Sequence, residues 1–427
     1  MIEPKLALMT ISQASKPQPL LRKAFPPNGL SARENGMLAV LEQAIEVHIA
    51  PKAAANDEKG RYPSSAIAAL KRSGLLKTAV PAAFGGLGFS SRFSLEAQLR
   101  LAIADSAVAQ IFKIHDELTR EISVYSTAEF RSSLARKLLD EDAILGLAVA
   151  ESGLKVNDPW TTVALPQTDG GFIIEGRKIY TTGAAEADYI VSWAFNPEAE
   201  GVATNPLLGV QGILVPANTA GVTIHRDWDA IGQRATDSGT ITFKQVRTKP
   251  NWSCNVPGKA PLSHASLRYQ AGFAAVLIGL GIGALKAAIP FVTEKSRPWP
   301  SAGVSNAADD PFVRRLAGEL TAELAAAYVL TLATGDLLDA HERGEIDRTA
   351  LAAPIYAAKA IASRAGVRAT SEIFALMGTR SVARANGFDR FWRNARTISL
   401  HDPVDWKHSE LGQHVLTGWD PPPGIYQ

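Results

Sequence analysis

The run GGFIIEGRKIYTTGAAEADYIV (170–191) contains three short segments rich in isoleucine, valine, threonine and tyrosine, residues that favour β-strands. Asp169-Gly170-Gly171 separates the first segment from TTVALPQ (161–167) and predicts a hairpin turn. Similar runs follow at YIVSWAF (189–195), QGILVPA (211–217) and TITFKQV (240–246). Six or seven short strands with polar turns predict a small β-barrel or sandwich over residues 144–250.

Helical spacing flanks this region on both sides. On the N-terminal side, PSSAIAALKRSG (63–74) starts with proline and stops at glycine, and SLEAQLRLAIADSAVAQIFKIHDELTREI (94–122) predicts one long or two consecutive helices. On the C-terminal side, long apolar helices are predicted over 262–295, 311–344 and 353–378. We therefore expect a tail (1–30), an N-terminal helical domain (31–143), the β domain (144–250) and a C-terminal four-helix bundle (260–427).

The predicted class is α+β and mostly α. The 427 residues are 46% hydrophobic and 20% charged, which excludes a disordered chain. A net charge of +2 gives no reason to expect nucleic acid as a partner, and the lone Cys254 excludes a disulfide framework. The charge-free stretch 269–285 is too short for a bilayer span and contains four glycines, so we expect a buried core helix and no membrane contact. The N-terminus is a poor secretory signal, and we expect a cytoplasmic protein.

Several common catalytic motifs are absent from the sequence. There is no G-x-x-x-x-G-K-[ST] loop, no H-E-x-x-H helix and no G-x-S-x-G elbow. GLGIG (279–283) follows no predicted strand and is therefore not a dinucleotide fingerprint. The eight histidines are scattered, and we predict no metal site.

Four segments together resemble the acyl-CoA dehydrogenase superfamily. They are VPAAFGGLGFS (80–90), residues 170–191, WDAIGQRATDSGTITFKQV (228–246) and the helix pair beginning at 262 and 312. The C-terminal run GFDRFWRNARTISLHDPVDWKHSELGQHVLTGWDPPPG (387–424) resembles the branch of dibenzothiophene and sulfur-acquisition monooxygenases. The resemblance implies helical, β and four-helix-bundle domains, a homotetramer, reduced FMN from a separate NAD(P)H:flavin reductase, and O2 as co-substrate.

The residues at the expected base positions support the monooxygenase branch. A dehydrogenase needs a carboxylate to remove the α-proton of a thioester. The family carries a glutamate either in a C-terminal loop, which reads RTISLHDPV here, or early in the first bundle helix, where no acid occurs between Ser238 and Thr293. Asp402 is a possible substitute base, or a turn cap. An FAD-dependent acyl-CoA dehydrogenase and a non-catalytic scaffold of the same fold stay open as alternatives.

The resemblance also indicates candidate catalytic residues. Thr182, after KIY, is expected to bond the reactive edge of the flavin; the alternative is a strand threonine. His401 replaces the dehydrogenase base and is expected to move a proton; the alternative is a turn histidine. His115 corresponds to a histidine that lines the cavity in sulfur-heterocycle enzymes, or is a half-buried helix residue. Its neighbours Lys113, Asp116 and Glu117 are polar, which argues against a purely apolar substrate.

Further positions are expected to bind the cofactor. Tyr180 and Trp228 correspond to aromatic residues that border the ring, although both can equally be core aromatics. Ser152 is expected at the pyrimidine side of the ring. Arg297 corresponds to an arginine that reaches a neighbouring subunit's flavin, and Arg380 is a second phosphate candidate. ALMG (375–378) replaces the family's Gly-Gly pair, which favours FMN over FAD. The resemblance leaves the substrate open as a small organosulfur or aromatic compound.

Overall fold

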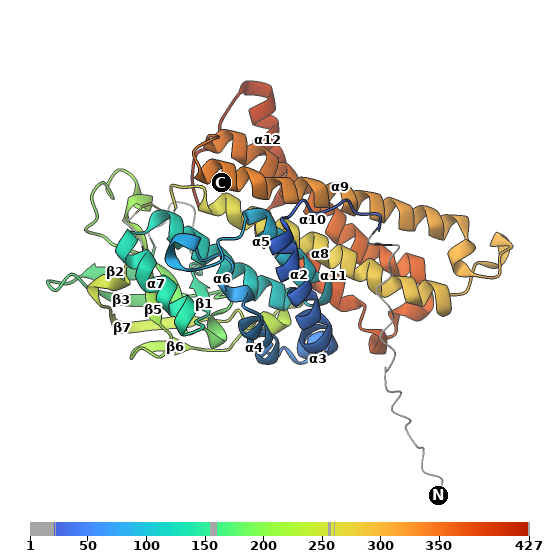
Figure 1. Cartoon of the computed structure of the whole chain (residues 1–427), viewed down its shortest axis with the longest axis horizontal. Coiled ribbons are helices and arrows are strands. Elements are labelled where there is room, and N and C mark those ends of the chain that lie inside the picture. The colour runs from blue at the N-terminus through green and yellow to red at the C-terminus, as the bar shows by residue number, and fades with distance from the viewer. Residues whose placement is uncertain (1–20, 22, 154–159, 255–257, 260, 426–427) are drawn as a thin grey trace, which may run out of the picture.

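The computed structural model of the protein describes residues 21, 23–153, 160–254, 258–259 and 261–425. Most of the predicted tail over 1–30 lies outside the described residues, as does the segment that follows Gly153. The described chain is helical, then strand-rich, then helical, as the sequence predicts. Figure 1 shows the sheet at one end, the long helices at the other, and the N-terminal helices between them.

The N-terminal part is built from helices whose ends are capped by their own sequence. Ser31 and Glu34 form a reciprocal capping box at the start of the first of them. The Asp105 side chain accepts from the amides of Ala107 and Val108, so the predicted long helix is divided into two at this aspartate. The elements are α2 (Ala32–Ala44), a π-helical turn (Ile45–Ile49), α3 (Ala50–Lys59), α4 (Ser64–Ser73), α5 (Ser91–Ala104), α6 (Ser106–Tyr125) and α7 (Ala128–Asp140).

The middle part is one curled sheet of seven described strands. They are β1 (Leu145–Ala148), β2 (Val163–Pro166), β3 (Phe172–Lys178), β4 (Tyr189–Phe195), β5 (Val210–Pro216), β6 (Val222–Ile224) and β7 (Ile241–Arg247). The order is β1-β4-β2-β3-β7-β6, with β5 paired to β4. The hairpin predicted at Asp169-Gly170-Gly171 joins β2 to β3. The sheet is curled. Within the described strands no ladder joins β5 to β6, so the sheet does not close into a barrel.

The C-terminal part is a bundle of long helices. They are α8 (Ala265–Glu294), α9 (Pro311–Glu342), α10 (Arg348–Met377), α11 (Asp389–Ser399) and α12 (Val404–Thr417). α9 and α10 end just before Gly344 and Gly378, the two glycines that the sequence marks as stops. α8, α9, α10 and α11 pack on one another, and α12 packs on α10.

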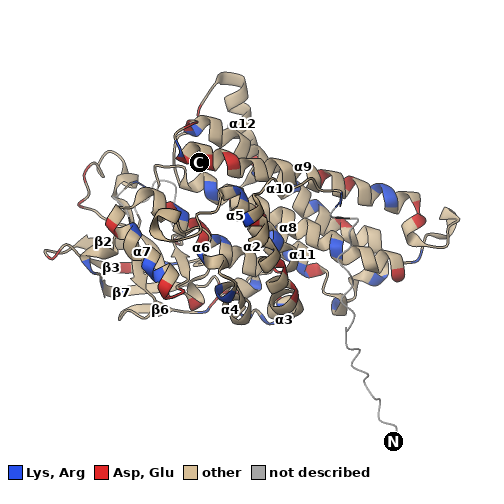
Figure 2. Ribbon diagram, viewed as in Figure 1, with Lys and Arg blue, Asp and Glu red and all other residues tan. Residues whose placement is uncertain are grey.

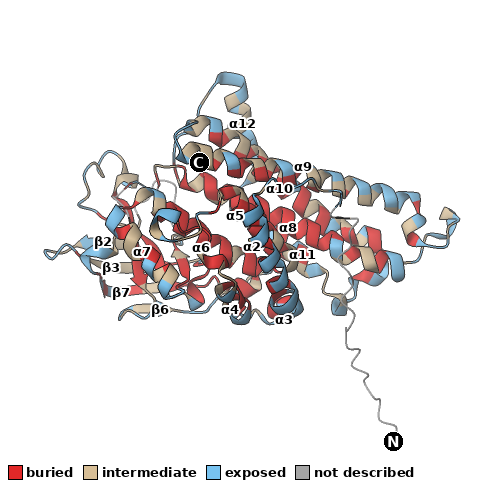
Figure 3. Ribbon diagram, viewed as in Figure 1, coloured by how far each residue is buried: buried red, intermediate tan, exposed pale blue. Residues whose placement is uncertain are grey.

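Helix α8 is the core of the molecule. α8 and α9 are both long and apolar enough to cross a bilayer by composition, but 78% of the apolar window of α8 is buried inside the fold, against 33% of that of α9. Figure 3 shows α8 almost entirely buried and α9 exposed along its outer side. α8 is therefore the buried core helix predicted from 269–285.

A close helix crossing explains one of the glycines of α8. An added Cβ at Gly279 would lie 2.4 Å from the carbonyl oxygen of Leu99 and 2.6 Å from the Cβ of Ala102, both on α5. Only glycine lets the two backbones approach this closely. The small residue thus fixes the depth at which α5 sits against the bundle.

Helix α6 joins the three parts. It packs on β1 on one side and on α8 on another, so its side chains reach both the sheet and the bundle. Charged side chains of both signs are interspersed over the helices in Figure 2, and no single-sign field covers this face. Sixteen of the twenty residues of α6 are buried, including five that carry a formal charge. Such a helix needs an explanation, because buried charges are costly unless they are paired.

Candidate functional site

An exposed aromatic surface lies where β3 ends. Tyr180 is 63% exposed and adopts a positive φ of 53°, a left-handed conformation that is strained for tyrosine. Its ring meets that of Trp228 edge to face, with centroids 5.9 Å apart. The Trp228 indole N–H donates to the carbonyl of Gln233 at 2.9 Å, which fixes the indole. An open pair of held rings suits a flat, partly apolar ligand.

A chain of hydroxyl groups lies beside these rings. The Thr182 hydroxyl is 2.8 Å from that of Ser238, which is 2.7 Å from that of Thr236. The Gln110 side-chain amide of α6 donates to Thr182 Oγ1 at 3.5 Å, while its Oε1 is buried without a partner among the described residues. The sequence indicated Thr182 but missed Ser238 and Gln110; Ser238 stands in the DSG of the quoted segment 228–246, and Gln110 gave no signal.

His401 forms a second wall, on the loop between α11 and α12. Its ring lies against Phe273 of α8, with centroids 4.1 Å apart and planes tilted by 39°. Its Nδ1 is 3.7 Å from Oδ1 of Asp402, whose carboxylate is buried and 3.3 Å from the ammonium of Lys359. Asp402 therefore lies on the Nδ1 side of the imidazole, and Nε2 is the nitrogen left for a ligand.

The surrounding protein also sets the charge of His401. Its side chain is 47% exposed, yet desolvation by the surrounding protein lowers its pKa, and the charges of Lys359 and Lys113 act in the same direction against Asp402. Burial alone would raise the pKa of Asp402, but the contact with His401 and the charge of Lys359 bring it below the ordinary value. His401 is thus a neutral imidazole beside a carboxylate that stays ionised.

The hydroxyl chain and the His401 wall meet the same part of α6. Gln110 contacts Thr182, and Lys113, three residues further on, has its ammonium 3.8 Å from the centroid of Phe273, the ring on which His401 packs. Three residues advance a helix by about 4.5 Å. The aromatic surface, the hydroxyl chain and the imidazole therefore surround one region between sheet and bundle.

The prediction that His115 is catalytic is wrong for a geometric reason. Its ring is fully buried, Nε2 lies 2.8 Å from the carbonyl of Leu76, and Nδ1 accepts from the amide of Leu145 at 3.1 Å. Both ring nitrogens are thus used by main-chain groups, and burial lowers the pKa. His115 ties α6 to β1 and has no nitrogen to offer a substrate.

The two predicted phosphate residues lie together at the far end of the bundle. Arg297 is exposed just beyond the end of α8, and Arg380 donates to the carbonyl of Lys295 at 3.0 Å. The helical rise puts the end of α8 about 30 Å from Phe273. Arg297 is therefore far from the His401 contact of its own chain, and the neighbouring-subunit role that the resemblance implies for it stays a prediction.

Ser152 is exposed on a bend after β1. The Glu151 carboxylate beside it binds the buried ammonium of Lys178 at 2.6 Å and accepts from the amides of Thr161 and Thr162. Although burial opposes it, the charge of Lys178 lowers the pKa of Glu151 to about 2. Glu151 is thus structural, and the role of Ser152 stays a prediction.

The residues present fit a flavin mononucleotide. A flavin is a flat ring system with hydrogen-bond donors and acceptors on its edge, and it would find the open Tyr180–Trp228 pair, the Thr182 hydroxyl and the unpartnered Oε1 of Gln110. That buried acceptor lacks a partner within the described chain, which is the condition in which a ligand donor adds most.

Family models confirm the architecture along most of the chain. Residues 31–142 match the N-terminal domain of acyl-CoA dehydrogenases, residues 146–246 match the middle domain, and residues 271–406 match the C-terminal domain.

Individual relatives point to one branch of that family. Dibenzothiophene monooxygenase of Mycolicibacterium goodii is 34% identical over 83% of this chain and 88% of its own. The probable FMNH2-dependent monooxygenase SfnC of Pseudomonas putida is 31% identical over 88% of this chain and 94% of its own. The crystal structure of FMN-bound TdsC from Paenibacillus sp. A11-2 superimposes with a TM-score of 0.86 at 31% identity, over 92% of this chain and all of that one. The chain belongs to the acyl-CoA dehydrogenase family, in its branch of flavin-dependent monooxygenases.

Proposed function

We propose that the protein is the oxygenase of a two-component system, which takes reduced FMN from a partner reductase and uses O2 to oxygenate a small organosulfur or aromatic compound. The observation that carries the proposal is His401. A neutral, half-exposed imidazole stands on the loop where a dehydrogenase has its base, and the nearest carboxylate on that loop, Asp402, is paired behind it. The relatives named above are monooxygenases, and one structure holds FMN.

The position of each site residue gives it a separate role in binding the cofactor or moving a proton. Bound reduced FMN supplies the electrons that activate dioxygen. Tyr180 and Trp228 would hold the ring of the flavin, and the Thr182 hydroxyl, held by Ser238, would bond its polar edge. His401 holds or accepts a proton at Nε2 next to the substrate, because Asp402 occupies the Nδ1 side.

Assembly and location form part of the same proposal. α9 is apolar but only one-third of its apolar window is buried, a pattern that fits a face covered by another subunit. The family resemblance also assigns Arg297 to the flavin of a neighbouring subunit. We therefore propose a cytoplasmic homotetramer, which sedimentation equilibrium would test; a monomeric mass of 45.5 kDa at micromolar concentration would contradict it.

The dehydrogenase alternative needs a free carboxylate at the substrate. Asp402 is 4% exposed and faces Lys359 at 3.3 Å and Lys407 at 4.0 Å. Removing this carboxylate from its pairs to act as a base would leave the buried ammonium of Lys359 without its carboxylate partner, while Lys407 keeps Glu410 at 3.3 Å. Asp402 is thus better placed to orient His401 than to abstract a proton.

A single set of measurements separates the three functions. Under anaerobic conditions, the protein is titrated with reduced FMN and then mixed with oxygen-18 dioxygen and a panel of organosulfur and aromatic compounds. Saturable binding and one labelled oxygen per product molecule are expected. Reduction of bound flavin by an acyl-CoA would instead indicate a dehydrogenase, and no saturable flavin binding would indicate a scaffold.

A further inference from the structure

Four ionisable residues form one line along α6. Lys113, Glu117, Glu121 and Tyr125 follow each other at intervals of four, so they project from the same face of the helix. The first three are 0%, 1% and 3% exposed. Twelve residues of helix span about 18 Å. We call these four residues the α6 line.

One end of the α6 line lies at the His401 wall. The Lys113 ammonium lies over the rings of Phe273 and Tyr269, 3.8 and 4.8 Å from their centroids. Phe273 is also the ring on which His401 packs, and the charge of Lys113 acts on the imidazole. The line therefore begins where a proton is needed.

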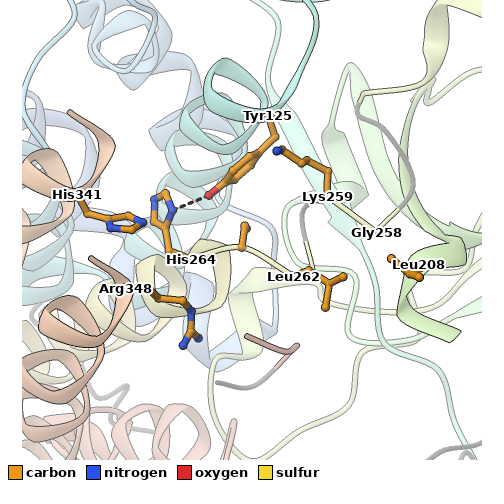
Figure 4. A pocket seen from close by; sticks show the side chains of 9 residues that line it. Tyr125, Leu208, Gly258, Lys259, Leu262, His264, His341 and Arg348 are labelled. Carbon is orange, nitrogen blue, oxygen red and sulfur yellow. Dashed lines mark hydrogen bonds between the residues drawn. The ribbon is translucent and has the colours of Figure 1, made fainter. Parts of the chain in front are cut away.

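The other end lies at a pocket of about 520 Å³ whose lining includes Tyr125, Lys259, His264, His341 and Arg348. Figure 4 shows Tyr125 and His264 pointing toward each other, with the phenol oxygen 2.5 Å from Nδ1. The other nitrogen of His264 is 3.1 Å from the Glu342 carboxylate, which is 23% exposed. A titratable pair thus connects the last residue of the line to a carboxylate within reach of water.

The two carboxylates between these ends are not saturated with partners. Glu117 uses one oxygen for Lys113, at 2.7 Å, and its other oxygen has no partner among the described residues. Glu121 accepts from the Tyr269 hydroxyl at 3.1 Å. Burial, the largest cause, raises the pKa of each to about 7, so both exchange protons near neutral pH.

A purely structural reading explains these groups poorly. Two adjacent buried carboxylates, with one direct contact to Lys113 and the charge of Arg268 nearby, cost stability relative to apolar side chains of similar size. The unpartnered oxygen of Glu117 adds a further desolvation penalty. Groups that are retained at such a cost, and titrate near neutrality, are typical of functional positions.

The reaction provides a use for them. One substrate, one O2, one reduced-flavin anion and one proton give the oxygenated substrate, oxidised FMN and one water. Two electrons pass from the flavin to dioxygen; one oxygen atom goes to the substrate, and the other leaves as water. The flavin anion brings one hydrogen, so the second must come from solvent into a cavity that has to exclude bulk water.

We propose that the α6 line carries this proton from the Tyr125–His264 pocket to the cavity wall at His401. The carboxylates act as relay groups, with Glu121 the step between Tyr125 and Glu117, and single waters bridge the intervals that no direct hydrogen bond spans. This inference rests on the proposed oxygenase function.

The decisive variant is Glu121→Gln, because glutamine keeps the shape and can still accept from Tyr269 but cannot take up a proton. Turnover under saturating reduced FMN and O2 is expected to fall at least tenfold, with a solvent isotope effect larger than in the wild type and partial rescue by small weak acids such as imidazolium. A wild-type rate with an unchanged isotope effect overturns the proposal.

The matched control is Glu96→Gln. Glu96 is 2% exposed and pairs with Arg100 at 2.7 Å with an i,i+4 spacing, as Glu117 pairs with Lys113, but it lies on α5 outside the line. The control is expected to lose stability without a change in isotope effect. If Glu96→Gln slows turnover as Glu121→Gln does, with the same isotope effect, the proposal is wrong.

A readout without flavin separates this inference from the proposed function. Infrared difference spectra of the flavin-free protein between pH 5 and 9 are expected to contain the carbonyl band of protonated carboxylic acids that titrates near pH 7, and Glu121→Gln is expected to lose the Glu121 component and keep that of Glu117. Absence of this band in the wild type overturns the relay. Presence of the band, with no oxygenation of any substrate, leaves the line intact as a proton-exchanging path and contradicts the oxygenase function.

Discussion

At the residue scale, the imidazole of His401 is the group most directly tied to the chemistry. His401→Ala is expected to keep the dissociation constant for reduced FMN and to lower the oxygenation rate by about 10²- to 10⁴-fold, the usual contribution of a positioned acid–base group. Flavin titration and product formation measure the two quantities separately.

The control for His401→Ala is His408→Ala, an exposed histidine on α12. It is expected to leave both quantities unchanged. A His401→Ala protein that forms product at the wild-type rate would remove His401 from the mechanism and leave the Asp402–Lys359 pair as a purely structural contact.

Arg297 tests the other candidate contact with the cofactor. Arg297→Ala is expected to raise the FMN dissociation constant about tenfold, since charge-assisted bonds to phosphate contribute about 1.5–3 kcal/mol. Arg247→Ala, which breaks only an exposed pair with Asp169 at 3.1 Å, is the control and should have no effect. An unchanged constant in Arg297→Ala would exclude it from the phosphate site.

The sequence identified site residues that belong to a recognisable motif. It missed residues that reach the site only through tertiary packing. Tyr180, Thr182 and Trp228 stand in quoted motifs, and the structure brings them together. Phe273 and Lys359 could not be foreseen, because their contact with the His401 loop joins positions far apart in the chain. His115 was misjudged since nothing in IFKIHDELT reveals that two main-chain groups hold its ring.

At the element scale, helices were easier to foresee than the pairing of strands. Glycine and proline mark helix ends locally, so α9 and α10 follow from the sequence, whereas the sequence left one or two helices open over 94–122 and the structure places the break at Asp105. The order of the sheet does not, because β4 pairs with β1, β2 and β5 through contacts that no local pattern encodes.

The α5–α8 crossing is tested by Gly279→Ala. The added methyl group would meet the main chain of Leu99 at 2.4 Å, so the free energy of unfolding is expected to fall by about 1–3 kcal/mol in urea titrations. Gly36→Ala on α2, where no atom lies within 4 Å, is expected to leave stability unchanged or raise it by up to about 1 kcal/mol. Equal effects would mean that helix propensity, and not the crossing, governs both positions.

The α6 line also predicts how stability depends on pH. The pKa of Glu121 is raised from 4.5 to about 7 by burial, so the folded state binds more protons than the unfolded state between these values. The contribution of Glu121 is therefore fully present below pH 4.5 and is lost as the pH rises to about 7.

The groups that face Glu121 enter the same titration. They are Glu117 and Tyr125 on α6, Arg268 and Tyr269 on α8, and the buried thiol of Cys254. Because all of them stay in Glu121→Gln, the difference in free energy of unfolding between wild type and variant isolates this carboxylate. That difference is expected to change in favour of the variant from pH 4.5 to 7; a difference independent of pH would show that Glu121 is ionised throughout.

At the scale of the whole molecule, helix α8 extends from the ring that packs on His401 to the predicted phosphate-binding residue Arg297. α8 carries Phe273, on which His401 packs, and ends just before Arg297, about 30 Å away. The sequence indicated His401 and Arg297, and the structure places them against parts of α8 that are about 30 Å apart.

If Arg297 binds the flavin of a neighbouring subunit, as the proposed tetramer requires, each reaction centre is a composite of two polypeptides. Purified His401→Ala and Arg297→Ala proteins, each impaired alone, should regain activity when unfolded and refolded together, since a hybrid assembly contains some centres with both intact contributions. The recovered fraction would follow the statistics of random subunit mixing, and its absence would mean that every centre is built within one chain.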